Sequence, residues 1–264
     1  MDHTQRLHQC IRDIAAGRYS GAVLELTRDE YPTEVRELAE AVGMMMVGIE
    51  SRQFHLEQLA ETIRQNSLKT VTSIAHALGA RDEYTVGHDE RVAAYSVRLA
   101  ARFGLPKRER RDIELAGLLH DIGKIHFSDR LFSDLDTAES PEIIEEIRLH
   151  PAVGYEILKH LDFLDPVPEL VLAHHERMDG HGYPRGLTGP DIPLGARILA
   201  VADCFDAMTT NRSYRKGRSV DQTLASLRDM AGPHLDPDLV PLFVSDIEDG
   251  GLESQSRLWT SDQA

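Results

Sequence analysis

Apolar residues recur at helical spacing through nearly the whole chain, and no segment shows the strict alternation of a half-buried strand. From residue 67 onward, glycine and proline separate one helical pattern from the next. We place one helix end before Pro151, because the residue that precedes a proline avoids the helical region. The expected helices cover residues 71–78, 89–103, 109–122, 141–149, 152–161, 168–175, 194–208 and 220–230. We therefore predict an all-α domain over residues 67–250, followed by a polar tail at 251–264.

A heptad pattern precedes this domain. Its apolar positions are spaced three and four residues apart over about four repeats, with Arg52 interrupting one d position. These positions are Val35, Leu38, Val42, Met45, Ile49, Leu56, Leu59 and Ile63. Such spacing is typical of a coiled coil, although one amphipathic helix lying on the following domain would show a similar pattern. We expect the coiled coil, and hence a homodimer through residues 35–63.

Residues 1–66 combine this pattern with a shorter helix before it. A helical segment that includes Ile11 ends at Gly17, a connector runs to about Thr33, and the heptad segment follows. This order of helix, connector and helix resembles a HAMP-type signalling module. The resemblance implies a parallel dimer and a signalling role for this part of the chain.

Charge and cysteine content argue against several classes of protein. The 264 residues carry a formal net charge of −15 at pH 7, so neither a DNA or RNA duplex nor an anionic membrane surface is an expected partner. Only two cysteines are present, Cys10 and Cys204, which argues against a disulfide framework and a cysteine zinc site. The longest apolar stretch, residues 41–49, is too short to span a bilayer. We expect a cytoplasmic protein.

Asp203 gives the strongest single argument for a buried site. It lies in residues 196–205, which are apolar almost all round and so predict a buried helix. A buried carboxylate has to be paired or to bind a metal. A salt bridge to an arginine is therefore the alternative to a metal site at this residue.

Two pairs of polar residues lie at the ends of other apolar segments. His120 and Asp121 end one helical run, and His174 and His175 end another. A single histidine in such a place is more often a satisfied core residue. Several such residues at the ends of separate helices are harder to explain in that way, and they favour a shared metal site.

Two further histidines complete the candidate set. His150 precedes Pro151 at the expected helix break, and His88 precedes the helix that begins near Asp89. Helices packed as a bundle can bring such side chains together. Nitrogen and oxygen ligands without thiolate suit Fe, Mn, Zn or Ni. The set exceeds the needs of one tetrahedral ion, so we expect two divalent ions bridged by Asp121. Fe and Mn are preferred, with Zn, Ni and Mg as alternatives.

Two close divalent ions suit phosphoester hydrolysis, because together they deprotonate a bridging water and neutralise the phosphoryl oxygens. Lys124, one helical turn after His120, could hold a phosphate as a point charge. Taken alone, a lysine there more often complements the dipole at a helix C-terminus.

These motifs together resemble the HD-GYP phosphodiesterases, a branch of the HD superfamily that hydrolyses cyclic di-GMP. The similarity runs from about residue 80 to 240. It is carried by residues 81–88, 118–124, 150–154, 174–184, 201–203, 206–209 and 236–237. So many motifs in the same order are specific, and they imply a helical HD-type bundle with phosphodiesterase activity.

The resemblance also implies roles for individual residues. The metal ligands would be His88, His120, Asp121, His150, His174, His175 and Asp203. Lys124 would contact the scissile phosphate, with Asp121 and Lys124 forming the catalytic pair. Gly182 and Tyr183 would form a lip facing the substrate, and Arg212 and Arg215 would bind phosphate or guanine. The product would be linear pGpG, with further hydrolysis to GMP left open.

The chain departs from the family pattern at several positions. Tyr84 stands where some members have a glutamate that binds a third metal, so we favour two ions. Met178 replaces a usual tryptophan, and His181 replaces a small hydroxyl residue. Asn211 and Ser213 stand where Asp and Pro are common.

Two alternatives to a cyclic di-GMP phosphodiesterase remain open. The changes at Met178 and His181 motivate the same chemistry on another cyclic dinucleotide, such as a mixed one. The heptad pattern motivates a non-catalytic protein that binds nucleotide and metal as a sensor. Loss of metal ligands would favour the sensor, but all seven are present.

Overall fold

The computed structural model describes residues 3–18, 21–79, 87–127, 141–211 and 216–251. The chain divides into two compact units, Met1–Leu68 and Lys69–Ala264. Within the described ranges the regular structure is helical, with two isolated bridges in place of strands, which confirms the predicted all-α fold. No helix in these ranges is both long and apolar enough to cross a membrane.

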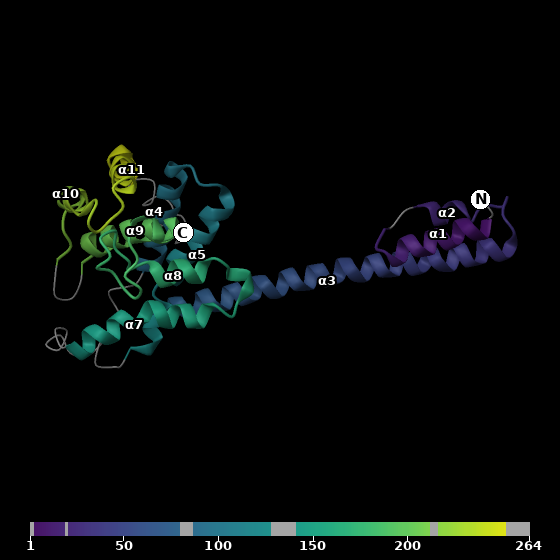
Figure 1. Cartoon of the computed structure of the whole chain (residues 1–264), viewed down its shortest axis with the longest axis horizontal. Coiled ribbons are helices and arrows are strands. Elements are labelled where there is room, and N and C mark those ends of the chain that lie inside the picture. The colour runs from purple at the N-terminus through teal and green to yellow at the C-terminus, as the bar shows by residue number, and fades with distance from the viewer. Residues whose placement is uncertain (1–2, 19–20, 80–86, 128–140, 212–215, 252–264) are drawn as a thin grey trace, which may run out of the picture. The chain divides into compact units, whose positions relative to one another are not determined.

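The first unit contains two short helices and the beginning of a long one. Helix α1 covers His3–Ala15, α2 covers Ala22–Glu25, and α3 covers Thr33–Gly79. Helices α1 and α3 run in the same direction, and the connector that contains α2 runs back in the opposite direction (Figure 1). A small core joins the three helices through Leu7, Val23, Leu26, Ala39, Val42 and Met46. The order helix, connector, helix is as expected, while the likeness to a HAMP module stays a prediction.

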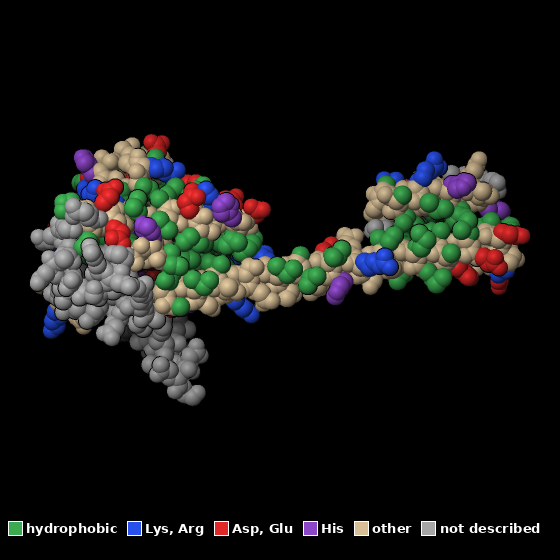
Figure 2. Space-filling view, turned by 90° about the horizontal axis from the view of Figure 1, so that it is seen from below, with side chains coloured by type: hydrophobic (Ala, Val, Ile, Leu, Met, Phe, Trp, Pro, Cys, Tyr) green, Lys and Arg blue, Asp and Glu red, His purple; other side chains and the backbone are tan. Residues whose placement is uncertain are grey.

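The heptad segment lies wholly within α3, and its apolar positions fall into two groups. Val42 is buried in the small core and Val35 packs against that core. The other six positions are exposed, from 39% at Ile49 to 64% at Met45. Hydrophobic side chains accordingly gather on the surface of this unit (Figure 2). Within the first unit, the small core therefore covers only two of the eight apolar heptad positions, which together we call the heptad seam.

The second unit is a bundle of helices around α9, Leu194–Thr209. Helices α4 (His88–Phe103) and α5 (Lys107–Leu119) pack on each other and on α9, and α7 (Pro141–Leu158) packs on α8 (Val167–Ala173). The last two α-helices cover Val220–Met230 (α10) and Leu239–Asp246 (α11). Short helical turns cover Ile122–His126 (η1), Asp162–Leu164 (η3), Gly189–Asp191 (η4) and Ile247–Gly251 (η5).

An aromatic cluster holds three of these helices together. Tyr95 of α4, Phe205 of α9 and Phe243 of α11 are each at most 5% exposed. Their ring centres are 5.1–6.0 Å apart in edge-to-face arrangements, the geometry that aromatic pairs prefer. This cluster fixes α9, which carries Asp203, against α4, which begins at His88.

Three predictions about the helices are wrong. The separate helix expected at residues 71–78 is the end of α3, which runs without a break from Thr33 to Gly79. Pro151 does not end a helix, because α7 continues through it from Pro141 to Leu158. A further helix, α11, follows the last one that we expected. Pro241 lies in its first turn, where a missing backbone N–H costs nothing, so the proline is compatible with a helix there.

Candidate metal centre and substrate pocket

Three histidines of the second unit present the same ring nitrogen to a common centre. In His120, His150 and His174, Nδ1 lies 2.8, 2.6 and 2.5 Å from the backbone carbonyl oxygen three residues earlier. A carbonyl can only accept, so each Nδ1 carries the proton and donates it. In the neutral form of each ring, Nε2 then keeps a free lone pair, which is the tautomer that binds a metal ion.

The accepting carbonyls are free because of where they lie in their helices. The carbonyls of Gly117 and Val171 belong to the last turns of α5 and α8, which lack intrahelical partners. The carbonyl of Ile147 would normally accept from residue 151, but Pro151 has no N–H. The proline that we took for a helix break thus frees the oxygen that orients His150.

His88 differs from these three histidines, because a side chain and not a backbone carbonyl orients its ring. It is the first residue of α4, and its Nδ1 lies 2.7 Å from Oδ2 of Asp206. Its Nε2 faces Asp203 at 3.4 Å and Asp121 at 4.0 Å. Burial lowers the pKa of His88, but the bonds to Asp203 and Asp206 outweigh it and raise the pKa to about 10. His88 therefore lies between two carboxylates.

Asp121 lies between the other groups, with one oxygen on each side. Its Oδ1 is 3.4 Å from Nε2 of His150, and its Oδ2 is 3.5 Å from Nε2 of His120. The ammonium of Lys124 donates to Oδ2. Burial would raise the pKa of Asp121, yet Lys124 and the neighbouring imidazoles hold it well below its usual range. The carboxylate is ionised and faces imidazoles on both sides.

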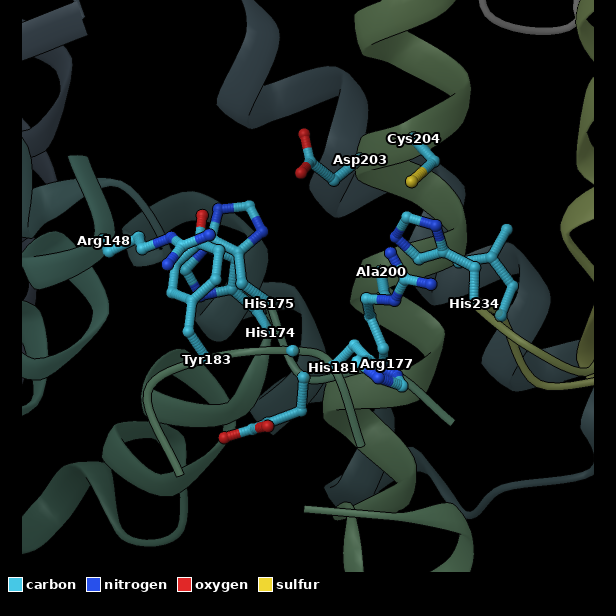
Figure 3. A pocket seen from close by; sticks show the side chains of 13 residues that line it. Arg148, His174, His175, Arg177, His181, Tyr183, Ala200, Asp203, Cys204 and His234 are labelled. Carbon is cyan, nitrogen blue, oxygen red and sulfur yellow. The ribbon is translucent and has the colours of Figure 1, made fainter. Parts of the chain in front are cut away.

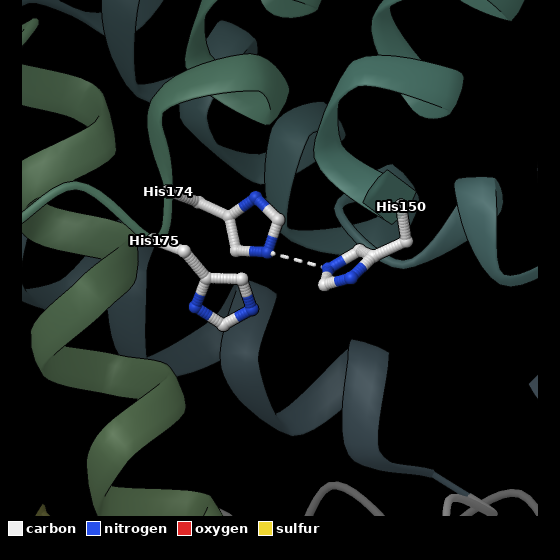
Figure 4. Close-up of side chains that lie close together, drawn as sticks. All are labelled: His150, His174 and His175. Carbon is white, nitrogen blue, oxygen red and sulfur yellow. Dashed lines mark hydrogen bonds between the residues drawn. The ribbon is translucent and has the colours of Figure 1, made fainter. Parts of the chain in front are cut away.

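The facing imidazoles of His150 and His174 test whether a metal fits here. Their Nε2 atoms are 3.2 Å apart (Figure 4), although both nitrogens carry lone pairs. Burial lowers the pKa of both residues, so a proton shared between the two nitrogens is disfavoured. A cation bound by both nitrogens relieves this repulsion, and the donor set therefore fits a metal ion.

His175 and Asp203 complete the two halves of the centre. The ring of His175 is 4.0 Å from that of His174 and 5.0 Å from that of His150. Burial lowers its pKa to about 4, so this imidazole is neutral as well. Burial would raise the pKa of Asp203, but the imidazoles, His88 above all, lower it well below its usual range. One half of the centre is thus formed by three histidines, and the other contains His88 and His120 with the carboxylates of Asp89, Asp121 and Asp203.

Gly123 allows the helices that carry these ligands to approach closely. A Cβ on Gly123 would lie 1.9 Å from the carbonyl oxygen of His150 and 2.7 Å from the amide nitrogen of Gly154. No other residue fits there without moving η1 away from α7. The Ile122-Gly123 step after the His120-Asp121 pair therefore has a steric role in bringing Asp121 to His150.

A pocket of ≈ 330 Å³ opens beside this centre (Figure 3), within the size range of small-molecule sites. His175, Asp203 and Tyr183 line it, together with Arg148, Arg177 and His234. The ring of Tyr183 is 4.8 Å from that of His175, and the guanidinium of Arg148 lies 5.9 Å from the centre of the Tyr183 ring. The pocket therefore joins the ionised carboxylate of Asp203 and several imidazoles to a wall with positive charge.

The lip at residues 180–184 is held against the tandem histidines by its backbone. The amide of Tyr183 donates to the carbonyl of His175 at 3.1 Å. A Cβ on Gly182 would lie 2.4–2.6 Å from backbone atoms of residues 175–177, so only glycine permits this contact. The Gly-Tyr pair thus places the Tyr183 ring over the centre for a steric reason.

Glu176 holds the residues that follow the lip through hydrogen bonds to their backbone. Its side chain is buried, and its two oxygens accept from the backbone amides of Arg185 at 2.7 Å and Leu187 at 2.9 Å. We did not predict this role. A glutamate directly after two buried histidines was the only signal for it, and its partners could not be inferred from spacing.

Met178 and His181, the two departures from the family pattern near the lip, have different surroundings. Met178 packs against the buried cluster of Ala173, Ile192 and Ala196, facing the core. His181 lines the pocket, with its side chain 80% exposed. Of these two residues, His181 is therefore the one positioned to contact a ligand in the pocket.

The structure brings together all seven predicted ligands but leaves some predictions outside its described residues. These are the roles of Tyr84, Arg212, Ser213 and Arg215. Asp206 belonged to a recognised motif without an assigned role. Its signal was a second acidic residue one turn after Asp203 on an apolar helix, to which the same argument about buried carboxylates applies.

A helical bundle with His-Asp ligands at its helix ends defines an HD-type domain, and comparison with known proteins agrees. The chain belongs to the HD domain family, whose model matches residues 49–239. Its His-Asp and Gly-Tyr-Pro motifs place it in the HD-GYP branch of that family.

Several curated relatives are phosphodiesterases of cyclic dinucleotides. The chain is 35% identical, over 77% of its length, to the cyclic di-GMP phosphodiesterase response regulator RpfG of Xanthomonas campestris, of which this covers 53%. It is 35% identical over 74% of its length to a cyclic di-GMP phosphodiesterase of Thermotoga maritima, covering 55% of it. It is 36% identical over 79% to the 3'3'-cGAMP-specific phosphodiesterase 2 of Vibrio cholerae, covering 40%. The chain thus spans about half the length of these relatives.

Solved structures share the fold. A cyclic GMP-AMP-specific phosphodiesterase of Vibrio cholerae superposes with a TM-score of 0.55 at 20% identity, over 69% of this chain and 48% of the other. An HD-GYP-like protein of Bdellovibrio bacteriovorus gives 0.52 at 23% identity, over 72% of this chain and 63% of the other.

Proposed function

We propose that the chain is a metal-dependent phosphodiesterase and that its substrate is cyclic di-GMP, which it opens to linear pGpG. The proposal is carried by one observation: unprotonated imidazole nitrogens 3.2 Å apart lie next to a carboxylate that faces both halves of the centre. Relatives named as cyclic di-GMP phosphodiesterases support the choice of substrate.

The residues of the centre have distinct parts in this proposal. Two divalent ions held here would supply an activated water and neutralise charge on the phosphoryl oxygens. Asp121 would hold the two ions close together through its two oxygens. Burial lowers the pKa of Lys124, but the charge of Asp121 raises it above its usual value. Lys124 therefore stays an ammonium, available to balance the charge of the phosphate.

The pocket wall would orient the substrate. Burial, reinforced by the charges of Asp203 and Asp121, raises the pKa of Tyr183, so its hydroxyl keeps its proton and can donate to a phosphate oxygen. The guanidinium of Arg148 adds a cation next to that ring. Arg212 and Arg215 remain the predicted contacts for phosphate or guanine, and Fe and Mn remain the preferred ions for this donor set.

A mixed cyclic dinucleotide is the second candidate substrate. Two observations favour it: His181 lines the pocket, and relatives at 36% identity are named 3'3'-cGAMP-specific phosphodiesterases. Hydrolysis of an equimolar mixture of cyclic di-GMP and 3'3'-cGAMP by one protein sample distinguishes the two. The substrate that disappears first has the higher kcat/KM.

Turnover by metal-loaded protein tests the proposal as a whole. Full-length protein, purified without oxygen and loaded with Mn²⁺ or Fe²⁺, is incubated with cyclic di-GMP and the products are separated by chromatography. We expect linear pGpG. Protein with two bound ions that turns over no cyclic dinucleotide would contradict the proposal.

We also propose that the protein is a homodimer through residues 35–63. The six exposed heptad positions would leave a continuous apolar stripe in water if the helix stayed alone. A second copy of α3 covers such a stripe by packing the a and d residues of one helix between those of the other. The likeness to a HAMP module makes this dimer parallel.

A further inference from the structure

We infer that Asp206 is a positioning residue for the metal centre, which makes the ion on the His88 side the more tightly bound of the two. This inference rests on the proposed two-ion site. Neither a motif nor a relative's name assigns Asp206 a part in that site.

The partner of Nδ1 distinguishes His88 from the other histidines. His120, His150 and His174 donate Nδ1–H to neutral backbone carbonyls. His88 instead meets the carboxylate of Asp206 at 2.7 Å. A carboxylate partner makes an imidazole a stronger electron donor to a metal than a carbonyl does. The same imidazole therefore binds a cation more tightly when Asp206 is ionised.

Asp206 is itself held rigidly. Its side chain is buried, and Oδ1 accepts from Nε of Arg91 at 2.6 Å. Its Oδ2 accepts from the terminal nitrogen of Arg91 at 3.0 Å, while it also bonds His88. The guanidinium of Arg91 thus bonds both oxygens of Asp206, a geometry that matches a carboxylate partner. This pair connects α9 to α4 and fixes the His88 ring.

The orientation imposed by Asp206 directs the free nitrogen of His88 into the centre. With Nδ1 bonded to Asp206, Nε2 faces Asp203 at 3.4 Å and Asp121 at 4.0 Å. An ion in this half would be bound by His88 and His120 together with carboxylates. An ion in the other half would be bound by the three neutral imidazoles of residues 150, 174 and 175. The negative charge of these carboxylate ligands and the carboxylate partner of His88 both favour tighter binding of the ion on the His88 side.

Titration of metal-free, full-length protein with Mn²⁺ alone tests this inference. Electron paramagnetic resonance of free Mn²⁺ counts the bound ions and gives a Kd for each. We expect two unequal Kd values in the wild type. Asp206→Asn, which keeps the size of the side chain but removes its charge, should weaken the tighter ion about 10- to 100-fold and leave the weaker one unchanged.

Two control variants separate positioning from general damage. Arg91→Met removes the ion pair between α4 and α9 but keeps the carboxylate beside His88, so it should lower stability more than metal affinity. Asp246→Asn removes another buried carboxylate of the same unit, which pairs with Arg98 and Arg102 away from the centre, and should leave both Kd values unchanged.

The outcomes are distinguishable. A wild type that binds fewer than two ions would overturn the two-ion proposal and this inference with it. Two ions in the wild type with equal losses in Asp206→Asn and Arg91→Met, or with no loss in Asp206→Asn, would overturn the inference alone.

Discussion

The Nε2 atoms of His150 and His174 face each other at 3.2 Å, and the opposite nitrogen of each ring donates to a carbonyl. Burial lowers the pKa of both histidines, so neither ring readily takes the proton that would join them. Two lone pairs that point toward each other in this way form a favourable site for a cation. This contact therefore gives the metal-dependent account its structural basis.

Asp121→Asn should remove turnover while leaving the fold intact. The amide keeps the shape of the side chain but loses the charge that faces both halves of the centre. We expect kcat to fall at least about 100-fold, the loss that removal of one group stabilising the transition state produces. Steady-state hydrolysis of cyclic di-GMP measures this, with circular dichroism as the check on folding. Turnover within a fewfold of wild type would show that Asp121 does not bridge the ions.

Metal binding on the His88 side should strengthen as pH rises. The bonds to Asp203 and Asp206 outweigh burial and hold the pKa of His88 at about 10, so the metal-free imidazole carries a proton at neutral pH. An ion has to displace that proton, and below pH 10 protons therefore compete with the metal. The apparent affinity should rise about tenfold per pH unit. Mn²⁺ titrations at pH 6.5, 7.5 and 8.5 measure the slope, and equal affinities at all three would exclude a protonated His88.

Glu176→Gln should loosen the lip without removing the metals. One of the two backbone amides would lose its acceptor and face an NH₂ group. Leaving a buried donor unsatisfied costs about 1–3 kcal/mol. We expect a higher KM for cyclic di-GMP, by about tenfold, with two ions still bound. Glu169→Gln is the matched control, because Glu169 pairs with Arg185 at the surface. Equal changes in the two variants would argue against a role for Glu176 in shaping the pocket.

Charges on the heptad seam should separate the dimer. Leu56 and Leu59 are 63% and 47% exposed and occupy a and d positions of the predicted coiled coil. We expect the double variant Leu56→Glu, Leu59→Glu to be a monomer in light scattering at micromolar concentration. Met44→Glu provides the control, since Met44 is 73% exposed but lies off the seam. A wild type that is itself monomeric under these conditions would contradict the dimer.

The clustering of the candidate ligands could be predicted because its signals are local. Four of them, His120, Asp121, His174 and His175, follow directly on an apolar helix, and Asp203 lies on a helix apolar almost all round, where a polar residue has to be satisfied. His120, His174 and Asp203 were recognisable on that ground, and the resemblance to a known family added the rest. The helices themselves follow from the periodicity of their apolar residues, and boundaries differed by a few residues as helix ends fray.

What could not be predicted depends on contacts between distant segments. Pro151 was taken for a helix end, but the steric rule for the preceding residue is only a tendency, and α7 continues through the proline. Asp206 meets His88 across 118 positions of sequence, a pairing that no spacing reveals. Glu176 finds its partners in a turn whose path depends on Gly182.

The most direct test of the account is the turnover of cyclic di-GMP measured against the number of Mn²⁺ ions bound per chain. We predict little turnover up to one ion and a steep rise as the second ion binds, because the account requires both halves around Asp121 to be filled. Full turnover with one ion bound, or none with two, would contradict it.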